Sequence, residues 1–281
     1  MQNVFVWIIG KNKKNYSVSK WKHVDNTEFV KNYIRLQIEN SIEMGWDIND
    51  IIPITNFPLE HMGVKCYQAE SFCDWSSFAN KLVVVNEMIQ KGVITDNIWL
   101  HDCDCYQLVP FDFPAECKDW GYTRHDPKRD KNQGASGFFR KEGYDIVKKI
   151  AEEIQICRAP REELFLPIFY TPMKTHKREA REQYVSVNEH LTDHKFLMKK
   201  RSLDNYGIFA DRFSFLDYTY NLGIVKYFKR KYKHATKPIK ALHFHIELDI
   251  PKKCFLFGEN VYNIKVVTDK LEHLLKKYKF I

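Results

Sequence analysis

Two carboxylates separated by one residue are the strongest chemical signal in this sequence. Asp102 and Asp104 follow the apolar run Ile98–Leu100 in the segment IWLHDCDCY. On a strand that continued through this segment, both carboxylates would share one face, because side chains alternate along a strand. Two close carboxylates repel unless a cation neutralises them, and Mg²⁺ or Mn²⁺ suits such oxygen ligands. We predict a divalent-cation site that could hold a diphosphate, although an exposed pair of aspartates is the common alternative for this short motif.

The first hundred residues alternate between predicted strands and helices. The expected elements are a strand at Val4–Ile9, a helix at Thr27–Met44 before Gly45, a strand at Ile51–Ile54, a helix at Trp75–Lys91 and a strand at Ile98–His101. This order predicts an α/β domain with a mostly parallel sheet. Ligands of such sheets bind beyond the carboxyl ends of the strands. The loop after Ile9 and the motif after Leu100 are therefore the two candidate sites.

After Tyr106 the predicted strands and helices no longer alternate regularly. This part of the chain contains a glycine-bearing turn and strand at Asn132–Arg140, a helix at Lys141–Gln155, an apolar stretch at Leu164–Tyr170, a polar and basic segment at Thr171–Leu203, a strand at Ile239–Ile246 and a basic helix at Val261–Tyr278. The segment Thr171–Leu203 is interpreted as a mobile flap or an acceptor-contacting insertion. With no internal repeat and no low-complexity linker, a single domain is expected.

Three segments resemble the GT-A class of glycosyltransferases, especially members with a glycogenin-like or galactosyltransferase-like layout. They are the helix–strand–motif unit Trp75–Asp104, the segment Asn132–Phe139 (NQGASGFF) and the segment Ala241–His245 (ALHFH). The resemblance implies a GT-A-like, Rossmann-type, mostly parallel sheet with helices on both faces and a C-terminal elaboration. It implies metal-dependent transfer of a sugar from a nucleotide-sugar, with a UDP-sugar preferred, to an acceptor hydroxyl.

The resemblance also implies how a single domain, 1–281, is divided. Residues 1–110 would form the half that binds the nucleotide-sugar. Residues 111–281 would form the acceptor half, with a basic insertion at 171–240.

A histidine late in the chain completes the metal site in many members of this class. His243 and His245 alternate on the predicted late strand and so share a face. The resemblance favours His243 as the third ligand beside Asp102 and Asp104, with His245 as the other candidate. A hydrogen-bonded core or surface histidine is the alternative for either residue.

Other site residues are expected at the nucleotide-sugar and at the acceptor. Contacts to the nucleotide-sugar are expected from Trp7, Ile9, Tyr16, Lys20, Asp102 and Gly134, although core packing is the alternative for Trp7. An inverting enzyme needs a carboxylate that takes the acceptor proton, and Glu162 and Glu163 are the candidates. Their alternative role is to lie at a helix N-terminus, where the helix dipole stabilises an acid.

Positive charge is concentrated in one part of the chain. The net charge is +8, and the segment Pro172–Lys240 holds 16 Lys and Arg against 7 Asp and Glu. Aromatic residues alternate with these basic residues: Tyr184, Phe196, Tyr206, Phe209, Phe213, Phe215, Tyr218, Tyr220, Tyr227, Phe228 and Tyr232. Basic and aromatic side chains together can hold phosphates and unstacked bases, so DNA is a candidate acceptor. A solvated helical surface is the plainer interpretation.

The acceptor and the reaction class each retain alternatives. A composition rich in Lys, Asn, Ile, Phe and Tyr suggests an AT-rich genome, as in many viruses, which makes a hydroxymethylated pyrimidine in viral DNA the first candidate acceptor. A glycan or protein acceptor is the second. A metal-dependent nuclease or nucleotidyltransferase, and a non-catalytic nucleic-acid-binding protein, are the competing functions.

Cysteine usage and hydropathy suggest a cytoplasmic protein. The seven cysteines form no paired C-x-x-C framework, so we expect reduced thiols rather than disulfides or a zinc site. No apolar run approaches the roughly 20 residues that cross a bilayer. Residues Met1–Gly10 lack the basic start and cleavage site of a signal peptide and are expected to form a buried strand. The oligomeric state is left open.

Overall fold

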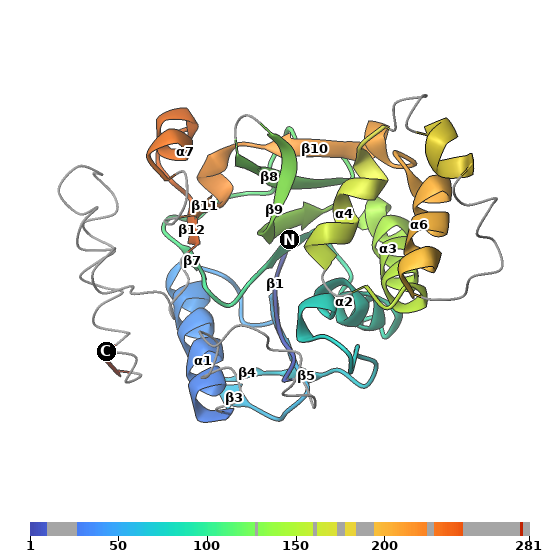
Figure 1. Ribbon diagram of the computed structural model, residues 1–281. Coiled ribbons are helices and arrows are strands. Elements are labelled where there is room, and N and C mark those ends of the chain that lie inside the picture. The colour runs from blue at the N-terminus through green and yellow to red at the C-terminus, as the bar shows by residue number, and fades with distance from the viewer. Residues whose placement is uncertain are drawn as a thin grey trace.

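A seven-stranded mixed sheet forms the centre of the molecule. The computed structural model describes residues 1–9, 27–126, 129–159, 162–172, 178–183, 194–223, 228–243 and 276–277 (Figure 1). The strand order is β10-β8-β9-β6-β1-β2-β5. Their bounds are β1 Gln2–Trp7, β2 Ile51–Thr55, β5 Tyr67–Gln68, β6 Ile98–His101, β8 Trp120–Asp126, β9 Arg129–Phe139 and β10 Phe213–Leu216.

Most neighbouring strands run parallel. The pairs β5–β2, β2–β1, β1–β6 and β10–β8 are parallel, while β9 runs antiparallel to both β6 and β8. Helices cover both faces of the sheet (Figure 1). The predicted fold class, an α/β protein with a mostly parallel sheet and helices on both faces, is therefore confirmed.

Strand β1 shows why both faces of the sheet are covered. Val4 pairs with Ile52 on β2 and with Leu100 on β6, at the centre of the parallel region. Val4 belongs to one hydrophobic cluster and Phe5 to the other, as expected for side chains that alternate along a strand. A strand that is apolar on both faces is typical of a buried parallel sheet.

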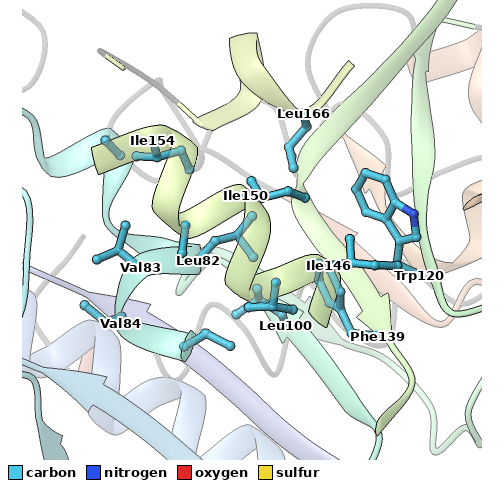
Figure 2. Close-up of a cluster of buried hydrophobic side chains, with 14 of the residues drawn as sticks. Leu82, Val83, Val84, Leu100, Trp120, Phe139, Ile146, Ile150, Ile154 and Leu166 are labelled. Atoms are coloured by element: carbon cyan, nitrogen blue, oxygen red, sulfur yellow. The ribbon is translucent and has the colours of Figure 1, made fainter. Parts of the chain in front are cut away.

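Three helices pack on the Val4 face of the sheet. They are α2 Lys81–Gln90, α3 Tyr144–Ile156 and α4 Glu162–Tyr170, and α6 His194–Asn205 packs outside them against α4. Figure 2 shows Ile146, Ile150 and Ile154 along the side of α3 that packs on α2, with Leu100 and Phe139 of the sheet near Ile146. All five of these side chains are fully buried. This apolar layer fixes α2 against the end of β6.

The Phe5 face carries helix α1 and a second, smaller sheet. Helix α1 spans Thr27–Glu43, and Gly45 follows it at φ +86°, a left-handed conformation that favours glycine after a helix. The small sheet has the order β11-β12-β7, with β11 at Leu222–Gly223, β12 at Ala241–His243 and β7 at Cys105–Gln107. Further elements are the hairpin β3 Glu60–His61 and β4 Val64–Lys65, the helix α7 Phe228–His234 and short 3₁₀ turns, among them Ser77–Ala79 and Tyr218–Tyr220.

Several predicted elements differ from the observed ones. The predicted helix Trp75–Lys91 is interrupted, because the side-chain amide of Asn80 bonds the backbone of Cys73 and Ser76, and α2 starts only after a 3₁₀ turn at Ser77–Ala79. Phe78, which lies in this 3₁₀ turn, is exposed. The apolar stretch Leu164–Tyr170 belongs to α4, and the predicted turn at Asn132 belongs to the long strand β9.

Two predicted elements lie partly outside the described residues. The late strand is described only as β12 Ala241–His243, and of the basic helix Val261–Tyr278 only 276–277 are described, in helical conformation. Part of the predicted flap Thr171–Leu203 is helical, since α6 begins at His194. Among the described helices, none has the length and apolarity that a membrane span needs.

Candidate metal and nucleotide-sugar site

The acidic motif forms a turn between two strands. Strand β6 ends at His101, β7 begins at Cys105, and the amide of Cys105 donates to the carbonyl of Asp102 at 3.0 Å. We call residues 102–104 the D-x-D turn. The expectation that Asp102 and Asp104 share a face of one continuous strand is therefore wrong. The turn still directs both carboxylates to one place.

The cysteines beside these aspartates do not share a face either. Cys103 packs with Phe5 on the α1 side of the sheet, whereas Cys105 packs with Trp99 near the small sheet. Both thiols are buried and free, and burial raises the pKa of each thiol well above its usual value. These two cysteines anchor the D-x-D turn in the core.

A late histidine joins the two carboxylates. Asp102, Asp104 and His243 each offer one ligand atom, and these three atoms lie within 4.8 Å of one another. His243 Nε2 is 3.2 Å from Asp104 Oδ1. The antiparallel pairing of β12 with β7 places His243 opposite Cys105 and so beside the turn (Figure 1). Of the two predicted histidine ligands the structure brings His243 to the cluster, while His245 lies outside the described residues.

The chemistry of this cluster fits a divalent cation. Two carboxylate oxygens and an imidazole nitrogen form a mixed oxygen and nitrogen set that suits Mn²⁺, and Mg²⁺ with water ligands. Burial raises the pKa of Asp102, the Lys81 ammonium opposes this effect, and the carboxylate of Asp104 adds to it. A cation between the carboxylates would relieve their repulsion.

Lys81 gathers three predicted site residues around one buried ammonium. Its Nζ lies 2.5 Å from Asp102 Oδ1, 3.2 Å from Glu162 Oε1 and 2.8 Å from the carbonyl oxygen of Gly134. Burial alone would lower the pKa of Lys81, but the carboxylates of Asp102 and Glu162 outweigh burial and raise it well above the usual value. The lysine therefore stays charged and holds one oxygen of Asp102.

Sequence reasoning missed Lys81, although one signal was present. Lys81 is the first residue of α2, and a cation at a helix N-terminus is opposed by the helix dipole. Glu162 compensates for this position, because its Oε2 accepts a hydrogen bond from the amide of Leu82 in the first turn of α2, at 3.2 Å. A lysine that opens an otherwise apolar helix indicates a buried acidic partner.

The predicted catalytic acids are placed as follows. Glu162 opens α4 and is only 2% exposed, with its carboxylate directed to Lys81 and the start of α2. Its expected role as a base toward an acceptor stays a prediction, and its contacts suit a residue that holds Lys81. Glu163 also lies in α4, but its side chain is outside the described set.

The predicted nucleotide-sugar contacts lie at neighbouring strand ends. Trp7 ends β1 and contacts the ring of Tyr33, with 5.3 Å between centroids. Just beyond it, the backbone of Ile9 exchanges two hydrogen bonds with the side chain of Asn56, at 2.9 and 2.8 Å. Gly134 is buried on β9. Tyr16 and Lys20 are outside the described residues, so their role stays a prediction.

The described aromatic residues of the basic segment are either buried or half-buried. Phe213, Tyr218 and Tyr220 are buried, and none of the described aromatic side chains predicted to hold bases is exposed. They face inward because β10 and the following 3₁₀ turn pack onto β8 and β9. Tyr170 stacks on Phe213, with ring centroids 4.1 Å apart. Phe213, Tyr218 and Tyr220 therefore belong to the core.

Comparison with known proteins finds similarity in solved structures only. No protein-family model and no curated protein matches the chain. A glycosyltransferase involved in glycosylation of the major capsid of PBCV-1 aligns over 86% of this chain and 93% of its own, with 11% identity and a TM-score of 0.43. The glycosyltransferase GlyE of Streptococcus pneumoniae TIGR4 aligns over 86% and 53%, with 13% identity and a TM-score of 0.43.

A third similar structure is the galactosyltransferase LgtC in complex with donor and acceptor sugar analogs. It aligns over 96% of this chain and 94% of its own, with 8% identity and a TM-score of 0.37. At these low identities the similarity is limited to the overall path of the backbone. The function is therefore argued below from this chain's own residues.

Proposed function

We propose that this protein is a glycosyltransferase that uses a divalent cation at Asp102, Asp104 and His243. One observation carries this proposal. Two carboxylates and an imidazole converge at the carboxyl end of β6, in the parallel part of the sheet, where ligands of α/β proteins bind. The substrate would be a nucleotide-sugar, proposed to be a UDP-sugar because the sequence resembles the GT-A class.

The residues of the chain have separate proposed tasks. A bound cation would offset the charge of the diphosphate leaving group. Lys81 would keep one oxygen of Asp102 engaged, so that this carboxylate presents its other oxygen to the site. Glu162 would act through Lys81 by holding its ammonium. The nucleoside would lie near Trp7 and Ile9, because Phe5 on β1 pairs with His101 at the end of β6.

The acceptor is the least constrained part of the proposal. DNA with hydroxymethylated pyrimidines was the first candidate from the sequence, on the strength of basic and aromatic residues at 171–240. Three of the described aromatic residues in that segment, Phe213, Tyr218 and Tyr220, are buried, which reduces the stacking surface available to unstacked bases. We therefore propose a glycan or protein hydroxyl as the acceptor and keep modified DNA as an explicit arm of the test.

The test is release of nucleoside diphosphate from a panel of nucleotide-sugars in Mn²⁺ or Mg²⁺. We expect slow release from one nucleotide-sugar, lost in the Asp104→Asn variant and retained in Asp112→Asn, where an exposed aspartate outside the cluster is changed. Oligosaccharides, a protein extract and hydroxymethylcytosine-containing DNA are then added separately. The addition that accelerates release identifies the acceptor class.

Two results would reject the proposal. Absence of release from every nucleotide-sugar, with folded protein, would remove the transferase reading. Cleavage of nucleic acid that depends on Asp104 would assign the site to phosphoryl chemistry instead.

A further inference from the structure

One polar side of helix α1 is buried against the back of the D-x-D turn. Gln37, Asn40 and Ser41 follow helical spacing, and each is at most 2% exposed. A buried polar side chain costs free energy unless its hydrogen bonds are made, so the partners of these three residues indicate their purpose.

Two of these side chains bind backbone groups at and after the D-x-D turn. Gln37 Nε2 donates to the carbonyl of Cys103 at 2.7 Å. The side chain of Asn40 makes two hydrogen bonds with the backbone of Gln107. It accepts from the backbone amide and donates to the backbone carbonyl, each at 2.9 Å. These hydrogen bonds connect helix α1 to the D-x-D turn and to the end of β7.

His101 provides a second connection to the same turn. Its Nδ1 lies 2.9 Å from the carbonyl oxygen of Asp102, and its Nε2 lies 2.7 Å from the side-chain oxygen of Asn3. Asn3 in turn donates to Ser41 Oγ at 2.8 Å. An imidazole with its proton on Nδ1 donates to the carbonyl oxygen of Asp102 and so holds that peptide group.

These contacts control the angle between the two metal-binding aspartates. The carbonyls of Asp102 and Cys103 belong to the two peptide planes on either side of the Cα atom of Cys103. Peptide units are planar, so φ and ψ of Cys103 set the angle between those planes. Fixing both carbonyls therefore fixes how the backbone presents the side chains of Asp102 and Asp104.

We propose that Gln37 and His101 are positioning residues that hold the D-x-D turn in the geometry that binds the cation. This inference rests on the function proposed above. Neither residue belongs to the ligand cluster, and both act through backbone carbonyls. Residues behind the ligands of metal sites change affinity by roughly 10- to 100-fold when they are replaced.

The variants separate positioning from simple packing. Gln37→Leu keeps the shape of the side chain and removes the hydrogen-bond donor, so Mn²⁺ affinity should fall by about 10- to 100-fold. His101→Asn keeps a donor near the Nδ1 position, whereas His101→Phe keeps a ring against Trp99, whose centroid is 3.9 Å from that of His101, and loses the donor. We expect His101→Asn to retain Mn²⁺ affinity better than His101→Phe.

Mn²⁺ binding is measured directly, from the electron paramagnetic resonance signal of unbound Mn²⁺ in a titration of the purified chain. Ile150→Val in α3 is the control for a loss of core packing far from the turn, and it should bind Mn²⁺ as the wild type does. Wild-type affinity in both Gln37→Leu and His101→Phe would overturn the inference and leave the proposed function intact. No Mn²⁺ binding by the wild type would overturn both. If Gln37→Leu does not fold, the difference in Mn²⁺ affinity between His101→Asn and His101→Phe tests the inference by itself.

Discussion

The ammonium of Lys81 lies 2.5 Å from a carboxylate oxygen of Asp102, in a site where two further negative groups are close. The Lys81 side chain is 12% exposed and that of Glu162 is 3% exposed, so water screens the attraction between Lys81 and Glu162 little. Asp104 is the other carboxylate near Asp102. The described groups here are the cluster Asp102, Asp104 and His243 and the adjacent pair Lys81–Glu162, and Lys81 is the only cation among them. Its positive charge offsets the repulsion between the carboxylates in the folded state.

Removal of Lys81 should destabilise the fold strongly. In Lys81→Met the carboxylate of Glu162 stays buried without its cation, which costs roughly 3–5 kcal/mol of the free energy of unfolding. The change is measured by urea unfolding. Lys65→Met, in the hairpin β3–β4, should change stability little because its ion pair with Glu60 is at the surface.

A second variant tests the cause of that loss. Glu162→Gln in the Lys81→Met background should recover part of the lost stability, because the uncompensated charge is removed. Additive losses in the double variant would show that the two side chains do not interact.

Cation binding should stabilise the wild type and fail in ligand variants. A saturating cation at 100 times its Kd adds about 2.7 kcal/mol to the free energy of unfolding. We expect a rise in Tm with Mn²⁺ that is absent in Asp104→Asn and His243→Ala and present in Asp112→Asn. An unchanged response in His243→Ala together with a lost response in His245→Ala would assign the third ligand to His245.

Acid should weaken the contact between α3 and α6 through Glu153. Arg201 donates two hydrogen bonds of 2.5 Å to the Glu153 carboxylate, and Lys149 donates a third of 2.9 Å. Burial alone would raise the pKa of Glu153, but these hydrogen bonds outweigh burial and hold the pKa below 4.5. A carboxyl with a lowered folded pKa stabilises the fold above its unfolded pKa, and this stability is lost as pH falls through the folded pKa.

Glu153→Gln measures this contribution. At neutral pH the variant should lose about 1.5–3 kcal/mol, typical of hydrogen bonds to a charged group. Below about pH 4.5 the difference from the wild type should shrink, because protonation removes the same charge from the wild type. Urea midpoints across that range check the convergence, and a constant difference down to low pH would contradict it.

The thiols should be nearly inert until the protein unfolds. Burial raises the pKa of Cys73 and of Cys117 to about 12, and the other described cysteines are also shifted upward. Thiolate is the reactive form, so a disulfide reagent should modify the native chain slowly and the urea-unfolded chain quickly. Cys66 is half-buried and Cys254 lies outside the described residues, so more than two fast thiols in the native chain would contradict this expectation.

Sequence patterns predicted the elements that depend on local chemistry. The strand Gln2–Trp7, the helix Thr27–Glu43 with its glycine at Gly45 and the strand Ile98–His101 were all expected within a few residues. Alternation failed at Asp102, because the chain leaves the strand there for a turn that its backbone hydrogen bonds stabilise. No local pattern shows where a strand gives way to such a turn.

The partners within the site could not be predicted for the same reason. Lys81, Gly134 and Glu162 are distant in sequence, and only the packing of α2 and α4 on the sheet brings them to Asp102. Gln37 was similarly hidden, because a single glutamine in an amphipathic helix normally faces water. Its burial depends on where α1 docks, which is a property of the tertiary fold.

The small sheet also determines when the site can form during synthesis of the chain. About 140 residues of chain separate Asp104 from His243, and β12 must pair with β7 before the imidazole reaches the carboxylates. At roughly 5–20 residues per second a ribosome needs about 7–28 seconds to make that span. Throughout this interval the emerging carboxylates lack their third partner. A cation that needs all three proposed ligands could therefore be held only by chains that have been translated beyond β12.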